Sequence, residues 1–256
     1  MNYYCGIDIG ASTVKLVIVD ENRQVAAQSL KRSGIDYSDS AETCLNDALA
    51  QAGLENNQVA GSISTGYGRD NVSWATGKKT EIACHGKGAY ENFSQSITVI
   101  DIGAQDNKVI HMGEAGRQIG FKMNRKCAAG TGAFIEEIAL RLDLPVSDLN
   151  GLAEKSTKDV SLGSFCTVFA ATEILARIRA GDKVEDIVKG AFRSVAKRIL
   201  EMDVVSNTLV LTGGVIANNP VMAGLVEESF GKDVLVPAHP QYIGALGAAL
   251  FALEKR

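Results

Sequence analysis

A short motif that places an acidic residue two positions before a glycine occurs twice in the chain. Residues 7–11 read Ile-Asp-Ile-Gly-Ala, and residues 100–104 repeat the same five letters, so that Asp8 and Asp101 lie 93 positions apart. A carboxylate at the end of an apolar run is costly unless it is paired or lies near a cation. A small-residue turn directly after it can bind phosphate through backbone N–H groups. The repeat predicts two copies of one hairpin that hold a nucleotide between them.

The two turns predict a set of phosphate and metal contacts. Asp8 and Asp101 are expected to face a nucleotide-bound Mg²⁺, largely through water molecules, as magnesium prefers. A turn-capping Asp is the alternative for a single copy, and the second copy in register favours the nucleotide. Lys108 is either a phosphate contact or an outward strand residue. The remaining phosphate contacts are predicted at Gly10, Ala11, Ser12, Thr13, Lys15, Gly103 and Ala104.

Two further features belong to this nucleotide hypothesis. Gln105 follows the second turn and is predicted to orient a hydrolytic water, as glutamines do in other NTPases, with Asp106 as the rival. A third glycine turn, Gly213-Gly214, lies between a strand pattern and a helical pattern. Glycine pairs allow a flat ligand to approach the backbone closely, so Gly213, Gly214 and Asn218 are predicted to contact adenosine.

The composition excludes several classes of function. The 256 residues are 46% apolar and 22% charged, with a net charge of −4. No basic block stands out, which argues against a nucleic-acid or anionic membrane surface. No apolar run reaches the length of a membrane-spanning helix. The chain enters a strand pattern at once, without a signal peptide pattern. We expect a cytoplasmic protein.

Hydrophobic periodicity predicts strands and helices that alternate along the chain. Strands are expected at 3–9, 14–19, 25–30, 59–65, 97–102, 108–112, 117–123, 208–212 and 234–236. Helices are expected at 38–52, 80–93, 133–142, 168–179, 184–204, 221–230 and 243–253. Three-strand meanders followed by helices indicate an α/β protein with two related lobes. The first lobe is expected at 1–95, with the option that the closing helix, 243–256, packs back on it, and the second at 96–242.

Two of the five cysteines precede helical patterns. Cys127 opens Cys-Ala-Ala-Gly-Thr-Gly, and Cys166 opens Cys-Thr-Val-Phe-Ala. Helix N-termini favour thiolates, which are the usual ligands of iron–sulfur clusters. Because a [4Fe–4S] cluster needs about four ligands, a homodimer would have to supply the other pair. Spacing alone favours two inert, packed cysteines instead. Structural roles are expected for Cys5, Cys44 and the pair Cys84-His85.

The turns together resemble the superfamily of sugar and acetate kinases, heat-shock chaperones and actin, over nearly the whole chain. That resemblance implies two ribonuclease-H-like lobes, the actin-like ATPase fold, with ATP between them. Four motifs are similar to those of the ATP-dependent activators of 2-hydroxyacyl-CoA dehydratases, of the BadF/BadG/BcrA/BcrD type. They are the two cysteine motifs, Asp-Ile-Gly-x-Gln-Asp and Thr-Gly-Tyr-Gly-Arg. Benzoyl-CoA reductase ATPase subunits are relatives. Family members often carry a second glycine where this chain has Ala104.

The family resemblance implies a function and its site. Cys127 and Cys166 would bind one [4Fe–4S] cluster shared by a homodimer. Gly130, Thr131 and Gly132 would lie near both nucleotide and cluster. Ferredoxin or flavodoxin would deliver one electron, and ATP would drive it to a partner dehydratase. The alternatives are an ATP-dependent reductase of a double-cubane iron–sulfur protein, a small-molecule kinase, and a filament or scaffold protein of the actin type.

Overall fold

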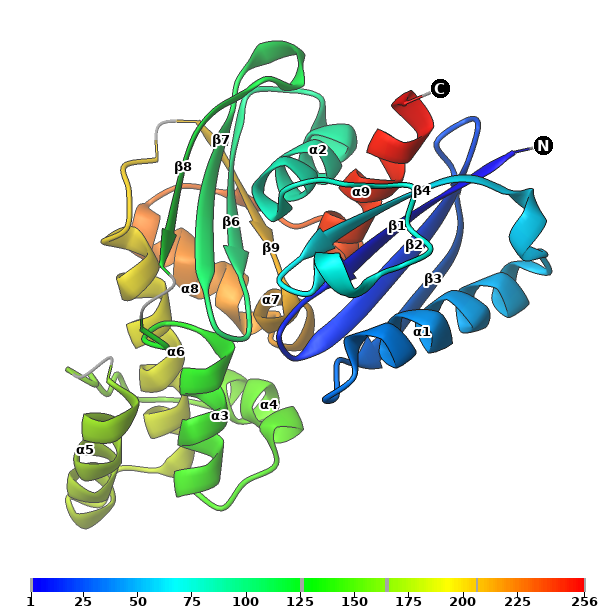
Figure 1. Cartoon of the computed structure of the whole chain (residues 1–256). Helices are drawn as coiled ribbons and strands as arrows, with labels where there is room; N and C mark the ends of the chain where they lie inside the picture. The colour runs from blue at the N-terminus through cyan, green and yellow to red at the C-terminus, as the bar shows by residue number, and fades with distance from the viewer. Residues whose placement is uncertain (1, 125–126, 164–165, 206, 256) are drawn as a thin grey trace. The chain divides into compact units, whose positions relative to one another are not determined.

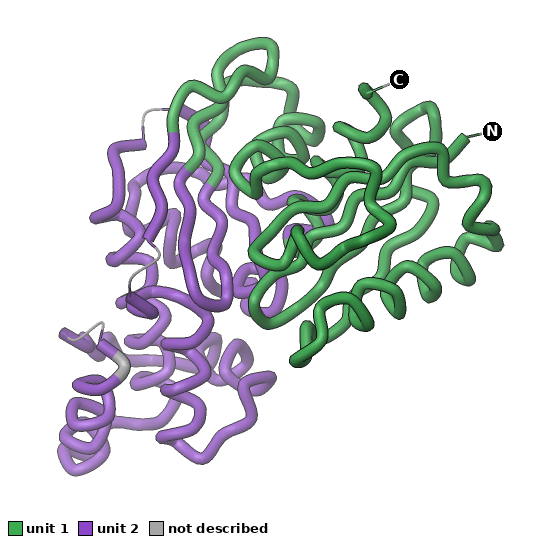
Figure 2. Tube along the Cα trace, in the orientation of Figure 1, with its two compact units in different colours: residues 1–99, 110–120, 241–256 green, residues 100–109, 121–240 purple. Residues whose placement is uncertain are grey.

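The computed structural model describes residues 2–124, 127–163, 166–205 and 207–255. These residues divide into two compact units (Figure 2). Unit 1 comprises residues 1–99, 110–120 and 241–256, and unit 2 comprises residues 100–109 and 121–240. The division passes through the strands of the second hairpin repeat, and the lobe boundary expected near residue 96 stays a prediction.

Unit 1 is built on a mixed sheet with the strand order β3-β2-β1-β4-β5 (Figure 1). Strands β1 to β3 form an antiparallel meander, and β4 pairs with β1 in parallel. The bounds are Tyr3–Ile9 for β1, Thr13–Asp20 for β2, Val25–Arg32 for β3, Val59–Gly66 for β4 and Gly77–Lys78 for β5. The meander predicted from period-two patterns is therefore confirmed.

Alternation along the strands of unit 1 sends side chains to two different helical layers. Ile7, Ile9 and Leu16 pack in one core cluster with helix α1 (Tyr37–Ala52). Tyr4 and Val17 point to the opposite face and pack with helix α9 (Ile243–Glu254). Helix α2 (Glu81–Phe93) contacts α9 on that same side. Because Asp8 shares the parity of Tyr4, its carboxylate points toward α2 and α9.

The second sheet has the strand order β10-β9-β6-β7-β8. Its strands are β6 (Ile97–Ile102), β7 (Asn107–Met112), β8 (Gln118–Asn124), β9 (Thr208–Thr212) and β10 (Val234–Leu235). The core of unit 2 joins Ile100 and Ile102 of β6 and Leu209 of β9 to residues of several helices. The helices are α3 (Gly132–Arg141), α4 (Leu149–Glu154), α5 (Thr167–Arg179), α6 (Val184–Leu200), α7 (Gly214–Asn218) and α8 (Val221–Phe230).

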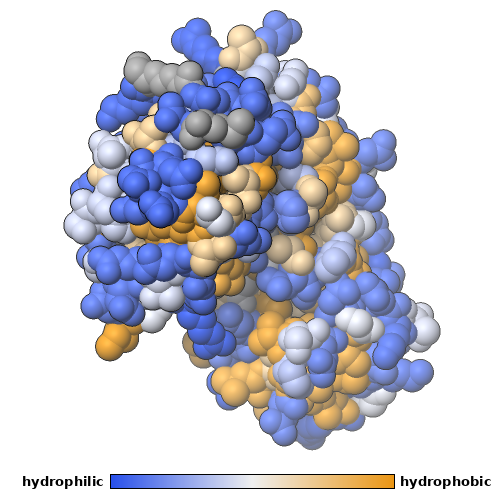
Figure 3. Space-filling model, turned by 90° about the vertical axis from the view of Figure 1, so that its right-hand side faces the viewer, coloured by the Kyte–Doolittle hydropathy of each residue, from blue (hydrophilic) through white to orange (hydrophobic). Residues whose placement is uncertain are grey.

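Figure 3 shows one face, on which hydrophilic residues predominate and hydrophobic residues gather in smaller areas. Among the described residues, no helix combines the length and the apolarity that crossing a membrane requires.

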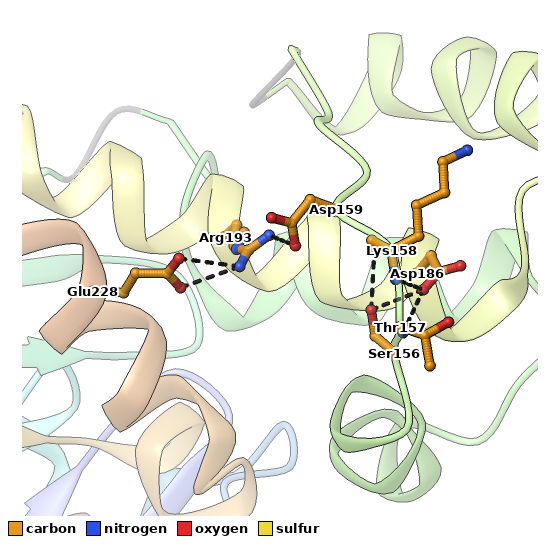
Figure 4. Close-up of polar contacts among 7 residues, drawn as sticks. All are labelled: Ser156, Thr157, Lys158, Asp159, Asp186, Arg193 and Glu228. Carbon is orange, nitrogen blue, oxygen red and sulfur yellow. Dashed lines mark hydrogen bonds and ion pairs between the residues drawn. The ribbon is translucent and has the colours of Figure 1, made fainter.

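Polar contacts join helix α6 to two neighbouring segments of unit 2 (Figure 4). Asp186 in its first turn accepts hydrogen bonds at one carboxylate oxygen from the backbone N–H groups of Thr157 and Lys158, at 3.0 and 2.9 Å. The Ser156 hydroxyl donates to the same oxygen at 2.9 Å. Further along α6, Arg193 binds Asp159 and also Glu228 of α8. The segment 156–159 and helix α8 are both tied to α6 by these contacts.

These bonds favour the ionised form of Asp186. The pKa of its carboxyl is lowered from the ordinary value of 3.8, chiefly because the Lys158 N–H donates to it. A carboxyl whose pKa falls on folding contributes stability above its unfolded-state pKa, and this contribution is lost as the pH falls through the folded-state value.

We expect Asp186→Asn to lower the melting temperature by several degrees at pH 7, because an amide oxygen accepts weaker hydrogen bonds than a carboxylate. The difference from the wild type should shrink as the pH drops below about 4. Calorimetry of both proteins between pH 7 and pH 3 measures this. A difference that stays constant over the whole range would contradict the assignment.

Candidate functional site

The first turn of the repeat is a compact hairpin loop in unit 1. The N–H of Gly10 donates to the carbonyl of Thr13 at 3.0 Å. Ser33 fixes the loop from the end of β3, because its backbone N–H donates to Ser12 O and its hydroxyl to Gly10 O at 2.6 Å. Ala11 and Ser12 are exposed at the tip. A side chain at Gly10 would lie 3.2 Å from Nζ of Lys15, so the Lys15 ammonium lies close to this turn.

Asp8 is buried directly behind the first turn. The residue is only 3% exposed, and its Oδ1 has no hydrogen-bond partner among the described residues. Its Oδ2 lies 4.0 Å from Nε2 of His85, which is also buried. Glycines line the space around the carboxylate, since a Cβ at Gly66 would approach Oδ1 to 2.4 Å and one at Gly244 would approach Oδ2 to 2.9 Å.

Close backbone packing brings His85 to this position. A Cβ at Gly247 of α9 would meet the carbonyl oxygen of Cys84 at 1.8 Å, and a Cβ at Gly88 of α2 would meet Ile243 O at 2.2 Å. The two helices therefore pack with their backbones almost in contact. The sequence interpretation treated Cys84-His85 as structural because the pair offers two metal ligands and no third lies nearby in the sequence. The structure places His85 beside Asp8, and only the glycine and alanine spacing of the closing helix hinted at so close an approach.

Both carboxylate oxygens of Asp101, in unit 2, accept hydrogen bonds. The Lys108 ammonium lies 3.2 Å from Asp101 Oδ2 and 2.7 Å from Asp106 Oδ1. The Thr212 hydroxyl donates to Asp101 Oδ1 at 3.0 Å. The expectation that Lys108 could be an outward strand residue is wrong, because the residue is only 1% exposed and forms a buried ion pair, whereas a contact of Lys108 with phosphate stays a prediction. Asp106, the rival to Gln105, is engaged with that lysine, and Gln105 is exposed in the turn.

The second turn is joined to the start of helix α3. The N–H groups of Gly132 and Ala133 donate to the carbonyls of Gly103 and Ala104, at 2.9 and 2.8 Å. A Cβ at Gly132 would come within 3.1 Å of the Ala104 Cα, so glycine permits this contact. The Gly130 carbonyl accepts a bond of 2.6 Å from the Asn107 amide. The predicted residues 130–132 thus lie against the second turn.

The third turn also lies beside Asp101, through Thr212. Gly213 has a φ of 102°, and a Cβ there would approach Ile102 O to 2.4 Å, so this position requires glycine. Helix α7 starts at Gly214, and the exposed side chain of Asn218 donates to the Gly214 carbonyl at 2.7 Å. The second and third turns therefore lie close together in unit 2, and their predicted contacts with a nucleotide stay a prediction.

The five cysteines fall into two groups, and all of them lie within the described residues. Cys127 is exposed and Cys166 is half-buried, whereas Cys5, Cys44 and Cys84 are buried. Cys166 is the N-cap of α5, as expected. Cys127 lies instead in the loop before α3, where its sulfur accepts from the Ala129 N–H at 3.5 Å. Burial raises the pKa of the Cys84 thiol to about 12 and that of Cys44 to about 11, and it also raises the pKa of Cys5.

The two mixed sheets with their covering helices define the class of protein: the chain has the actin-like ATPase fold. A solved ROK-family glucokinase from Streptomyces griseus shares this fold, with a TM-score of 0.60 at 14% identity over 99% of this chain and 100% of that chain. At that identity the likeness concerns the fold alone.

The family follows from closer similarities. The chain belongs to the BadF/BadG/BcrA/BcrD ATPase family, whose model matches residues 5–252. It is 40% identical to the (R)-2-hydroxyglutaryl-CoA dehydratase activating ATPase of Acidaminococcus fermentans, over 99% of this chain and 98% of the relative. The crystal structure of component A of that organism's dehydratase has a TM-score of 0.95 at 39% identity, covering 100% and 99% of the chains. The Clostridium difficile activator of 2-hydroxyisocaproyl-CoA dehydratase, solved with ADPNP bound, has a TM-score of 0.92 at 36% identity over 99% and 95%.

The burial of the cysteines predicts their reactivity. In iron-free native protein at pH 8, Cys127 and Cys166 should react with a disulfide reagent, whereas Cys5, Cys44 and Cys84 should react only after unfolding. Thiolate is the reacting species, and burial both hides these three thiols and raises their pKa. Thiol titration before and after denaturant measures this, and Cys127→Ser should remove one rapidly reacting thiol. Reaction of Cys84 as fast as that of Cys127 would show that the core of unit 1 opens readily.

Proposed function

We propose that this protein is an ATP-dependent activator that drives single electrons at low potential into an iron–sulfur partner enzyme of the 2-hydroxyacyl-CoA dehydratase type. The observation that carries the proposal is the 40% identity, over 99% of the chain, to a dehydratase activating ATPase. The exposed Cys127 close to the second turn supports it. Neither a kinase nor a filament protein gives a role to that cysteine.

The nucleotide in this proposal is ATP, hydrolysed to ADP. Residues 10–13 and Lys15 would contact phosphate from unit 1, and Gly103, Ala104 and residues 130–132 from unit 2. Gly213, Gly214 and Asn218 would contact adenosine. Asn218 donates one amide N–H to its own helix, which leaves its second N–H and its Oδ1 for a nucleotide. Gln105, exposed in the second turn, would orient the hydrolytic water.

The first turn suits a metal ion bound through water. Asp8 is a buried carboxylate with an oxygen that lacks a hydrogen-bond partner among the described residues, which is an environment that a water of hydrated Mg²⁺ would satisfy. Asp101 differs, since both of its oxygens already accept hydrogen bonds. Each carboxylate oxygen has two acceptor sites, so a water-mediated contact of Asp101 with Mg²⁺ fits as well. Mg²⁺ would supply charge neutralisation of the phosphates.

Two cysteine ligands fit one half of a [4Fe–4S] cluster. Cys127 and Cys166 both belong to unit 2, and both are accessible to solvent. A cluster of this type supplies one-electron redox chemistry. Cys127 and Cys166 would hold it as thiolates, and the same residues of a second chain would complete the ligand set. The described residues contain no group of three or more His, Cys, Asp or Glu side chains suited to a metal, which agrees with a cluster completed by a second chain.

Helix α5, which begins directly after Cys166, carries an apolar surface suited to that second chain. Val168, Phe169 and Leu175 are 72%, 67% and 60% exposed. Exposed large apolar side chains gathered on one helix are typical of an interface. A homodimer formed through this helix would bring two copies of Cys166 toward one axis. The electron donor in this proposal is ferredoxin or flavodoxin, and the acceptor is the partner dehydratase.

The cluster is tested by metal analysis. After anaerobic purification we expect about four iron and four sulfide per two chains. Cys127→Ala should lose both while it retains ATP binding, because the thiolate is a ligand and its loop can keep its backbone contacts. The matched control is Cys44→Ala, which removes a buried thiol of unit 1 and should retain the iron. Wild-type protein that remains free of iron after reconstitution would refute the redox proposal and favour a kinase.

The role of Asp8 is tested by ATP hydrolysis without a phosphate acceptor. Asp8→Asn should reduce kcat roughly 100-fold, because it removes the negative charge that helps to hold hydrated Mg²⁺ beside the phosphates. Iron content should be unchanged. Asp47→Asn, which alters an exposed ion pair with Lys31, serves as the control. Phosphate release at the wild-type rate from Asp8→Asn would exclude the metal role of Asp8.

A further inference from the structure

Among the residues that the structure describes, Lys108 is the most deeply buried charged residue. Its side chain is among the largest that are fully buried, and its residue exposure is 1%. A buried ammonium is tolerated only with partners of opposite charge. The partners are Asp106, at 2.7 Å, and Asp101, at 3.2 Å. Lys108 thus neutralises part of a site that contains two carboxylates.

The carboxylates that Lys108 binds lie on the two sides of the second turn. Asp101 ends the apolar part of β6, and Asp106 closes the turn because its carbonyl accepts the Gly103 N–H at 2.9 Å. Gly103 leaves little room beside that contact, since a Cβ there would lie 3.0 Å from Asp106 Oδ1. The ammonium therefore ties the strand end to the far side of the turn. It fixes the shape of the loop whose amides are proposed to hold phosphate.

The first copy of the repeat uses the equivalent lysine differently. Lys15 is paired in register with Asp8 and is half-buried, with its ammonium close to Gly10 at the turn itself. Asp8 keeps an oxygen without a hydrogen-bond partner among the described residues. Asp101, in contrast, has Lys108 on one oxygen and Thr212 on the other. The same motif therefore places Lys15 next to the first turn but Lys108 behind the second turn.

We propose that Lys108 is a positioning residue for the ATPase reaction, an internal cation that holds Asp101 and Asp106 and so prevents the second turn from recruiting a metal ion of its own. This inference rests on the proposed ATPase function and extends it. Lys108 does not touch phosphate in this arrangement, because it is buried behind the turn. It acts through the orientation of Asp101 and through the shape of residues 103–106.

Removal of this cation should have two measurable effects. In Lys108→Met, two carboxylates lose their counter-ion, and a divalent cation can replace it. Nucleotide-free Lys108→Met should therefore bind Mn²⁺ with a dissociation constant lower by about tenfold or more than that of the wild type. Its kcat for ATP hydrolysis should fall roughly 100-fold because the turn is misplaced. Its KM for ATP should change little, whereas Lys15→Met should raise KM.

The matched control is Lys31→Met, which removes the lysine of an exposed ion pair with Asp47 and should change neither quantity. The double variant Lys108→Met/Asp106→Asn keeps the net charge of the cluster. It should lose the extra Mn²⁺ affinity but keep the lowered kcat, and it provides the test if Lys108→Met does not fold.

Wild-type Mn²⁺ affinity in folded Lys108→Met would overturn the inference, as would wild-type kcat in either Lys108→Met or the double variant. Mn²⁺ binding is measured without nucleotide, by electron paramagnetic resonance of the unbound ion. It therefore tests Lys108 even if the wild type proves to have no ATPase activity, an outcome that would refute only the proposed function.

Discussion

Burial of a carboxylate at the end of an apolar strand is the constraint on which both turns depend. An ionised group out of water needs partners, and the two copies of the repeat meet this need with different neighbours. Asp101 is held by an ammonium and a hydroxyl. Asp8 is surrounded by glycines and faces His85 at 4.0 Å. Asp101 is thus held in place by hydrogen bonds, whereas Asp8 has open space around its carboxylate.

The space around Asp8 is a consequence of backbone packing in unit 1. A Cβ at Gly6 of β1 would meet Ala245 O at 2.0 Å, so α9 lies directly on the strand that carries Asp8. Gly247 and Gly88 allow α2 an equally close approach to α9. A larger side chain at any of these glycines would push a helix away and move His85 from the carboxylate. The small residues of the closing helix therefore act on the site from a distance in sequence of more than 200 residues.

Regular elements with a clear period were predictable from the sequence, whereas the contacts of the charged residues were not. The patterns at 3–9 and 97–102 gave β1 and β6 their correct bounds, and Gly53 ends α1 with a φ of 64° as expected of a C-cap. The helix expected to reach residue 204 ends at Leu200. Strand β5 and helices α4 and α7 were not predicted, because two to six residues contain too little of either period to be recognised.

Specific side-chain contacts and one glycine turn explain the remaining differences. Lys108 satisfies the strand period equally well as an outward or an inward residue, and its pairing is decided by Asp106 two positions away. His85 lies on helix α2, 77 positions after Asp8, so no local spacing in the sequence indicates that the two side chains are close. Cys127 was expected near a helix N-terminus, and helix α3 begins at Gly132, one residue before the predicted start at 133, but a loop with a sharp turn at Gly130, with a φ of 76°, separates Cys127 from the helix. A glycine in the motif was the visible sign of that turn.

The loop from Cys127 to Gly132 combines an exposed thiol with a firmly held backbone, and the proposed function needs both. Asn124 donates its side-chain amide to the Cys127 carbonyl, and Asn107 donates to that of Gly130. Gly132 and Ala133 bind the carbonyls of the second turn. Because Asn107 belongs to the same hairpin as that turn, any shift of the hairpin must displace residues 130–133 or break hydrogen bonds that stabilise the fold. If the loop were held loosely, a shift of the hairpin would not move the Cys127 thiol. This short path of hydrogen bonds from the second turn to the loop of Cys127 is the link through which, in the proposed function, nucleotide hydrolysis would act on that cysteine.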